Sequence, residues 1–209
     1  MKKVILFNFN GTITNTKFLA IDMYNEIAEK QGYKKISEEH VPYLSALLIR
    51  NRCKVLNLPL YKMPLVGIAI KRRSQQYIPN LKPVSGMKET LSLLKQEGYK
   101  IGFTTSNNQV VMNKFLTNHS INIFDYSHFS FSPLSKSKDI SSFLKKYDLK
   151  KENVVYVGDE LRDIKAAKKN GLFCIAVSWG FDSVELLNTG RADKVITQPK
   201  EIVDVLSRI

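Results

Sequence analysis

The chain has 209 residues, of which 44% are apolar, and this length suffices for one core domain with a modest insertion. No apolar run approaches the roughly 18 residues that a membrane span needs, and Cys53 and Cys174 lack metal-ligand spacing, which together predict a reduced cytoplasmic protein. The net charge of +13 suits anionic partners, but nucleic acid is not expected because the sequence contains no zinc finger, aromatic-basic motif or long Lys/Arg block.

The first half of the chain is predicted to contain one strand followed by helices. Apolar residues from Lys3 to Phe9 form a compact run before Asn10-Gly11, which is typical of a buried strand. Helical spacing of apolar residues is found over 16–30, from Ser37, over 44–56 and over 63–77. No strand is predicted between residues 15 and 80, so this part is expected to be a helical insertion.

The second half of the chain, after Pro83, alternates between strand and helix patterns. Predicted strands span 100–105, 126–131, 154–157, 173–177 and 194–197, and predicted helices span 87–97, 110–118, 139–147, 162–170 and 201–209. Such alternation predicts a parallel sheet with helices on both faces. The predicted fold class is therefore α/β, with a three-layer Rossmann-like core formed by residues 1–14 and 83–209 and a small helical cap formed by residues 15–82.

Polar side chains follow the predicted strands, at the edge where open parallel sheets bind their ligands. The set consists of Asn8, Asn10, Thr105, Ser106, Lys136, Lys138, Asp159 and Asp163. Lysine, hydroxyl and backbone N–H groups suit a bound phosphate, and carboxylates suit a hard cation. We therefore expect a ligand site at this edge.

The order of these motifs resembles that of the haloacid dehalogenase superfamily. That family has a DxDGT sequence after its first strand, a helical insertion, a threonine or serine, a lysine and a GDxxxD sequence. The chain matches this order except for the two aspartates of the first motif, and the stretches 157–171 and 177–181 look like the phosphoglycolate phosphatase-like branch. The resemblance covers essentially the whole chain, and it implies a phosphatase acting on a small phosphomonoester.

The resemblance also implies a role for each matching position. Asn8 stands where the family has its nucleophile aspartate, and Asn10 stands where it has its general acid/base aspartate. Thr105 and the Ser106 amide match the phosphate-binding residues. Lys136 matches the lysine of the third motif, which contributes to phosphate binding and to catalysis.

A magnesium site is implied in the same way. Family members bind Mg²⁺ through the first aspartate, the backbone carbonyl at the second, and a fourth-motif acid. The matching positions are Asn8, Asn10, Asp159 and Asp163. Lys138 is the alternative to Lys136 as the third-motif lysine. The implied partner is a small phosphorylated or anionic ligand, with no membrane.

The two asparagines predict a severe loss of activity. A neutral amide at position 8 cannot form an aspartyl phosphate, and an amide at position 10 cannot transfer protons. Loss of a nucleophile costs roughly a million-fold in other enzymes. Mg²⁺ is expected to bind more weakly because one carboxylate ligand is missing. The chain is thus expected to be an impaired or inactive phosphatase, and the alternative is a non-catalytic pseudophosphatase that binds an anion or a partner.

Several questions stay open at this level. The asparagines are compatible with a natural pseudophosphatase, with a deliberately inactivated variant, or with partial deamidation of Asn10, which would still leave the nucleophile missing. The basic residues Arg50, Arg52 and Lys54 of the expected cap either give the cleft a positive field or form a solvated helix face. The sequence names neither the substrate nor the oligomeric state.

Overall fold

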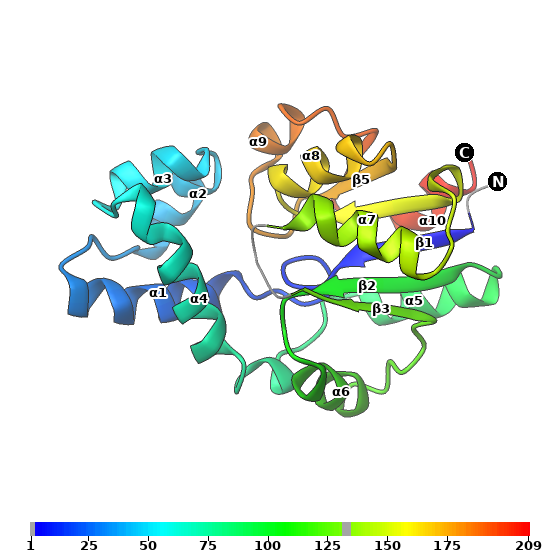
Figure 1. Ribbon diagram of the computed structural model, residues 1–209, viewed down its shortest axis with the longest axis horizontal. Coiled ribbons are helices and arrows are strands. Elements are labelled where there is room, and N and C mark those ends of the chain that lie inside the picture. Colours follow the sequence, from blue (N-terminus) through cyan, green and yellow to red (C-terminus); the bar gives the residue numbers. More distant parts are fainter. Residues whose placement is uncertain (1–2, 131–134) are drawn as a thin grey trace.

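The computed structural model describes residues 3–130 and 135–209 and contains a six-stranded parallel sheet (Figure 1). The strands are β1 (Val4–Asn8), β2 (Lys100–Thr105), β3 (Tyr126–Phe129), β4 (Val154–Gly158), β5 (Phe173–Val177) and β6 (Lys194–Ile196). Their order is β3-β2-β1-β4-β5-β6, so β1 lies between β2 and β4. Because the strand order reverses beside β1, a crevice opens at the carboxyl ends of β1 and β4.

Helices cover both faces of this sheet. They are α5 (Met87–Gln96), α6 (Gln109–Asn118), α7 (Lys136–Lys146), α8 (Leu161–Lys169), α9 (Val184–Asn188) and α10 (Glu201–Leu206). Ile5 and Phe7 of β1 belong to one apolar cluster with α5, α6 and α10, whereas Leu6 belongs to a second cluster with α7, α8 and α9. Burial on both faces explains the continuous apolar sequence of β1. The predicted three-layer, Rossmann-like α/β class is confirmed.

Residues 15–82 are all described, and they form helices and no strand. The elements are α1 (Lys17–Gln31), α2 (Val41–Ser45), α3 (Ile49–Val55) and α4 (Met63–Ser74), with 3₁₀ helices η1 (Glu38–His40), η2 (Leu60–Lys62) and η3 (Ile78–Asn80). They enclose an apolar cluster of their own that includes Tyr24 and Cys53. In Figure 1 this segment, coloured blue to blue-green, stands beside the sheet.

The prediction of one helix over 44–56 is wrong, because α2 ends at Ser45 and α3 begins four residues later. Arg52 of α3 lies against this break. Its guanidinium donates hydrogen bonds to the carbonyl oxygens of Leu44 (2.7 Å) and Ser45 (3.1 Å) at the end of α2, and the Leu44 oxygen also accepts the Leu47 N–H (3.1 Å). Arg52, a residue of α3, therefore caps the end of α2.

Other boundaries differ from the predictions by a few residues. Helix α7 begins at Lys136 rather than at residue 139, and α4 ends at Ser74 rather than at residue 77. Helix α9 was not predicted. Strand β3 ends at Phe129, and Phe131, which closed the predicted strand, lies outside the described residues.

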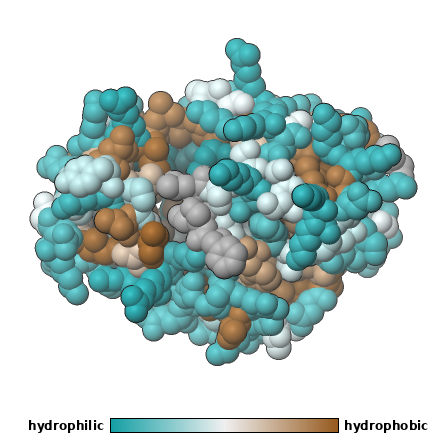
Figure 2. All heavy atoms as spheres, in the orientation of Figure 1, coloured by the Kyte–Doolittle hydropathy of each residue, from teal (hydrophilic) through white to brown (hydrophobic). Residues whose placement is uncertain are grey.

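The helical segment exposes several apolar side chains. Tyr61, Leu65 and Ile68 are all exposed, and Figure 2 shows hydrophobic patches at the left, over this segment. In the described part of the chain, no single helix is long and apolar enough to cross a membrane. Helix α3 taken together with η2 and α4 meets that requirement only as a pair bent by 113°.

Candidate active site

The first loop of the site follows β1. Asn8 is the last residue of that strand, and the turn after Asn10 is closed by a hydrogen bond from the Gly11 N–H to the Thr14 carbonyl oxygen (2.8 Å). Gly11 has a φ of +83°, and a Cβ at this position would lie 2.0 Å from Oδ2 of Asp159. Glycine is therefore needed here both for its backbone conformation and for the close approach of the loop to the end of β4.

Asn8 and Asp159 are in direct contact at the crevice. Nδ2 of Asn8 donates to Oδ1 of Asp159 (2.9 Å) and to the backbone oxygen of Asn10 (2.6 Å). Asp159 is fully buried and also accepts hydrogen bonds from the Thr12 hydroxyl (2.9 Å) and the Phe181 N–H (3.0 Å). Burial raises the pKa of Asp159 to about 7, and the neighbouring carboxylates act in the same direction.

These contacts bear on the Mg²⁺ that the resemblance implies. The two oxygens that would face a cation, Asn10 O and Asp159 Oδ1, already accept hydrogen bonds from the Asn8 amide. Asp163 is held in an ion pair with Lys136. Within residues 3–130 and 135–209, no three His, Cys, Asp or Glu side chains are grouped to hold a metal ion. In this arrangement the residues present do not fit a divalent cation.

Lys136 lies in the first turn of α7 and faces α8. Its Nζ is 2.9 Å from Oε2 of Glu160 and 2.5 Å from Oδ1 of Asp163. Burial disfavours the charged lysine, but the two carboxylates outweigh that effect and raise its pKa. Lys138 is exposed on the same helix. The fold thus brings Lys136, and not Lys138, to the site.

Glu160 and Arg162 extend this charged cluster, although neither was predicted to be a site residue. Arg162 donates to Oε2 of Glu160 from both Nε (2.8 Å) and Nη2 (2.7 Å). Although burial opposes ionisation, Arg162 and Lys136 hold the pKa of Glu160 well below its ordinary value. The Tyr156 hydroxyl donates to Oδ1 of Asp163 (2.9 Å). Glu160 and Arg162 lie inside the GDxxxD motif, so their place in the sequence could have indicated that they belong to the site.

Thr105 and Ser106 follow β2, the strand beside β1. Oγ1 of Thr105 accepts a hydrogen bond from the Asn107 N–H (3.1 Å), which leaves the Thr105 hydroxyl hydrogen available. Among the described residues, the N–H and hydroxyl of Ser106 have no hydrogen-bond partner. The Asn107 side chain, to which the sequence assigns no role, donates to Oδ1 of Asn10 (3.0 Å). These groups can donate to an anion.

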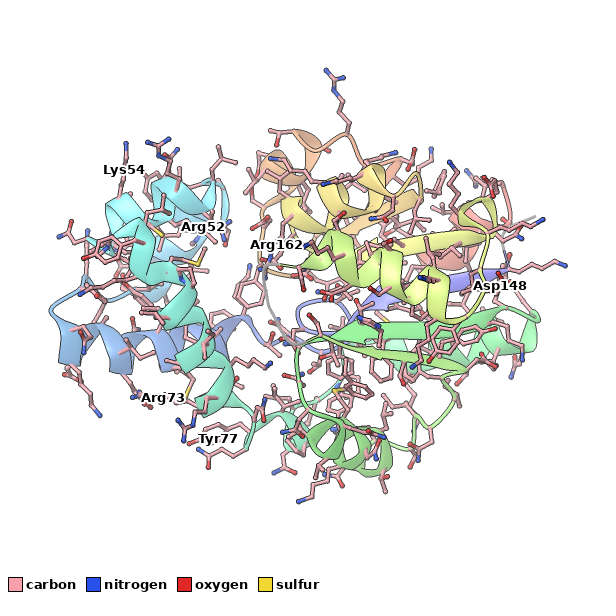
Figure 3. The ribbon with its side chains drawn as sticks, in the orientation of Figure 1. Arg52, Lys54, Arg73, Tyr77, Asp148 and Arg162 are labelled. Atoms are coloured by element: carbon pink, nitrogen blue, oxygen red, sulfur yellow. The ribbon has the colours of Figure 1, made fainter. Side chains whose placement is uncertain are left out.

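A cavity of about 350 Å³ lies between this edge of the sheet and the helical segment. Its polar wall includes Asn8, Asn10, Thr105, Ser106, Lys136 and Arg162. Its apolar wall comes from the helical segment and includes Leu19, Met63, Val66 and Ile70. Figure 3 shows Arg52 of α3 and Arg162 of α8 on facing sides of this space. The fourth-motif acids at 159 and 163 are buried and do not line the cavity.

An ion pair ties the helical segment to the site. Nη2 of Arg52 is 2.5 Å from Oδ1 of Asp182, and Oδ2 of Asp182 accepts the N–H of Leu161 at the start of α8 (2.6 Å). The Ser183 N–H also donates to the Ser45 carbonyl oxygen (3.0 Å). Burial raises the pKa of Asp182 despite its basic partner. These contacts join α2 and α3 to the loop after β5 and, through Asp182, to the N-terminus of α8.

Comparisons with known proteins show which family the chain belongs to. The family model described as haloacid dehalogenase-like hydrolase matches residues 5–177. A phosphoglycolate phosphatase from Synechococcus elongatus is 24% identical over 208 residues, which cover 99% of this chain and 98% of that protein. A glyceraldehyde 3-phosphate phosphatase from Pyrococcus furiosus is 26% identical over 233 residues, which cover 99% of this chain and 93% of that protein.

The fold has a close counterpart among solved structures. A predicted phosphatase from Clostridium acetobutylicum superposes with a TM-score of 0.83 at 20% identity, and each chain is covered completely. Fold and site together define a Rossmann-like protein with a helical insertion and a polar site at the switch point of its sheet. The chain belongs to the haloacid dehalogenase-like hydrolase family. The predicted resemblance is confirmed, and phosphoglycolate phosphatases are among its relatives at low identity.

Proposed function

We propose that this protein binds a small phosphomonoester at the carboxyl ends of β1, β2 and β4 and does not hydrolyse it at the rate of an intact phosphatase. The observation that carries this proposal is the Asn8 side chain, whose nitrogen is hydrogen-bonded to Asn10 O and Asp159 Oδ1. Position 8 is where the resemblance places the nucleophile. With an amide at this position, the chain would hold a phosphoester without cleaving it.

The chemistry of both asparagines supports the loss of turnover. Covalent catalysis needs a carboxylate oxygen that attacks phosphorus while the bond to the alcohol oxygen breaks, and the neutral amide oxygen of Asn8 is a poor nucleophile. The departing alkoxide needs a proton, and the hydrolytic water must later lose one. Asn10 can do neither, and its Oδ1 is occupied by the Asn107 side chain. Both halves of the reaction therefore lack their reacting group.

Binding of the phosphate does not depend on the missing carboxylates. Thr105, Ser106 and Lys136 all line the cavity, and they carry a hydroxyl, a backbone N–H and an ammonium group. Hydrogen bonds to a charged phosphate are stronger than those between neutral groups. Two aspartates next to a phosphate dianion would repel it, so the change to asparagine removes two negative charges from the binding site. These groups support anion binding without catalysis.

The cavity supports a ligand with an apolar organic part. We take residues 15–82 as a cap that covers the core formed by residues 1–14 and 83–209. The cap wall of the cavity is apolar, with Leu19, Val66 and Ile70 among its residues, whereas the polar wall lies at the sheet. A phosphate at the polar wall would place its organic substituent against the apolar wall. The ligand class is therefore a small phosphomonoester whose organic part extends into the cap.

The proposal predicts that Thr105→Val weakens phosphate binding. The variant keeps the shape of the side chain and removes the hydroxyl donor. A hydrogen bond to a charged group contributes about 1.5–3 kcal/mol, so the affinity for inorganic phosphate and p-nitrophenyl phosphate is expected to fall roughly 10- to 100-fold. Isothermal titration calorimetry of the unaltered and variant proteins measures the change.

Thr117→Val is the matched control for this experiment. Thr117 is an exposed threonine on α6 that does not line the cavity. Its replacement is expected to leave the phosphate affinity unchanged. If the unaltered protein does not bind phosphate, or if both variants bind it equally well, the anion site is not where we place it.

A further inference from the structure

We infer that the Asn8 amide group occupies the place of a divalent cation, so that the site keeps its shape and binds anions without Mg²⁺. Such a role of Asn8 does not require the site to have any catalytic activity. It rests on four hydrogen bonds to two residues and on the packing around Asp159.

The geometry around Asn8 is that of one donor group serving two acceptors. Its Nδ2 lies 2.6 Å from Asn10 O and 2.9 Å from Asp159 Oδ1. An amide NH₂ group carries two hydrogens, so each of these oxygens receives one. A divalent cation would draw in the same two oxygens, since carbonyl and carboxylate oxygens are its preferred ligands. The amide thus donates hydrogen bonds to the two oxygens that would otherwise coordinate a cation.

The remaining contacts of Asp159 leave it little freedom to turn toward an ion. Oδ1 also accepts the Thr12 hydroxyl (2.9 Å), and Oδ2 accepts the Phe181 N–H (3.0 Å). Cβ atoms built at Gly11 and Gly180 would lie 2.0 and 2.2 Å from atoms of this side chain, so the loops on both sides are packed against it. The carboxylate is held in its present orientation by donors and by close packing.

A cation could not enter this arrangement without breaking it. If the Asn8 amide were rotated by 180°, its Oδ1 would face Asn10 O and Asp159 Oδ1 in place of Nδ2. Three acceptor oxygens would then lie together without the two N–H donors that now separate them. That orientation is favourable only with a cation present, and reaching it breaks two hydrogen bonds. The second acid, Asp163, does not assist because it is paired with Lys136 and accepts the Tyr156 hydroxyl. Of the two fourth-motif acids, Asp159 alone would then be a carboxylate ligand.

The test compares Mg²⁺ binding by the unaltered protein and by Asn8→Asp. Both proteins are purified in Mg²⁺ and then transferred to chelator, so that folding is verified before the ion is removed. The unaltered protein is expected to show the same melting temperature in chelator and in millimolar Mg²⁺. Asn8→Asp is expected to melt lower in chelator, because two carboxyl groups then face each other without an ion between them, and they either repel or must take up a proton. Added Mg²⁺ is expected to restore it.

Calorimetric titration with Mg²⁺ alone gives the second readout. Asn8→Asp is expected to bind Mg²⁺ at least about tenfold more tightly than the unaltered protein, since the charge of the ligands sets the affinity for a hard cation. Asn113→Asp, which makes the same amide-to-carboxylate change at an exposed position of α6, is the control and is expected to show no Mg²⁺ response. Asn8→Ala removes the donor without adding charge and is expected to melt lower than the unaltered protein.

The outcomes separate this inference from the proposed function. Tight Mg²⁺ binding by the unaltered protein, or an Asn8→Asp protein that is equally stable in chelator, would overturn the inference. The same holds if phosphate binding by the unaltered protein requires Mg²⁺. Failure of phosphate to bind under any condition would remove the proposed function, and the Mg²⁺ titrations would still decide the role of Asn8.

Discussion

Replacing both Asn8 and Asn10 with aspartate is expected to raise the rate of phosphate release from small phosphomonoesters by roughly a million-fold. The double variant restores a carboxylate nucleophile at the end of β1 and an acid/base group two residues later. The other groups expected to act in catalysis are in place, because Thr105, Ser106 and Lys136 already line the cavity. The measurement is phosphate release in Mg²⁺ from phosphoglycolate and p-nitrophenyl phosphate.

Single variants show which group limits the rate. Asn10→Asp alone is expected to give no gain, because the nucleophile is still absent, and this variant also reproduces the product of deamidation at position 10. Asn8→Asp alone is expected to recover only part of the rate, since the leaving group then departs without an acid. A double variant that binds phosphate and Mg²⁺ but remains inert would show that the loss of function extends beyond the first motif.

Gly180→Ala is expected to destabilise the protein by about 3 kcal/mol. Gly180 is buried, and a Cβ at this position would lie 2.2 Å from Cβ of Asp159 and 2.4 Å from its Oδ2. Asp159 cannot move away without losing its contacts with Thr12 and Phe181. The clash therefore has to displace the loop after β5. Denaturant unfolding gives the change in the free energy of unfolding from the shift in midpoint.

Gly67→Ala is the matched control for this prediction. Gly67 lies inside α4, and a Cβ added there would meet nothing within 4 Å. Alanine is the better helix former, so this variant is expected to be more stable by about 1 kcal/mol. Equal effects of the two substitutions would show that the packing around Asp159 is looser than the structure indicates.

The place of the site could be predicted because it depends on local patterns. Asn8, Thr105 and Asp159 each follow or end an apolar strand. If these strands are parallel, all three residues lie at the same edge of the sheet. The structure has β1 between β2 and β4, so the three strand ends are neighbours. The continuous apolar runs of β1 and β4 were visible for the same reason, since both strands are buried throughout.

Contacts between distant segments could not be predicted. The sequence left open whether Arg52 contributes a positive field or lies on a solvated helix face. In the structure it pairs with Asp182, 130 residues away, and caps the end of α2. A single charged residue has no periodic signature, so its partner becomes visible only in the fold. The interruption of the helix predicted over 44–56 was missed for this reason.

The choice between Lys136 and Lys138 also depended on the fold. Both lysines lie in one short polar stretch, and the sequence alone favours one only by resemblance. Helix α7 begins at Lys136, which places that side chain against Glu160 and Asp163 at the start of the neighbouring helix α8. The orientation of the Asn8 amide could not be predicted either, because the two oxygens that fix it come together only in the folded protein.

The central claim, that Asn8 allows phosphoester binding without turnover, is tested most directly on the unaltered protein. Phosphate release and ligand binding are measured on one sample in Mg²⁺, and intact-mass and peptide analysis verify asparagine at position 8. The predicted result is measurable binding of p-nitrophenyl phosphate with no phosphate release above the uncatalysed background. Release at the rate reached by the Asn8→Asp/Asn10→Asp protein, with Asn8 verified, would contradict it.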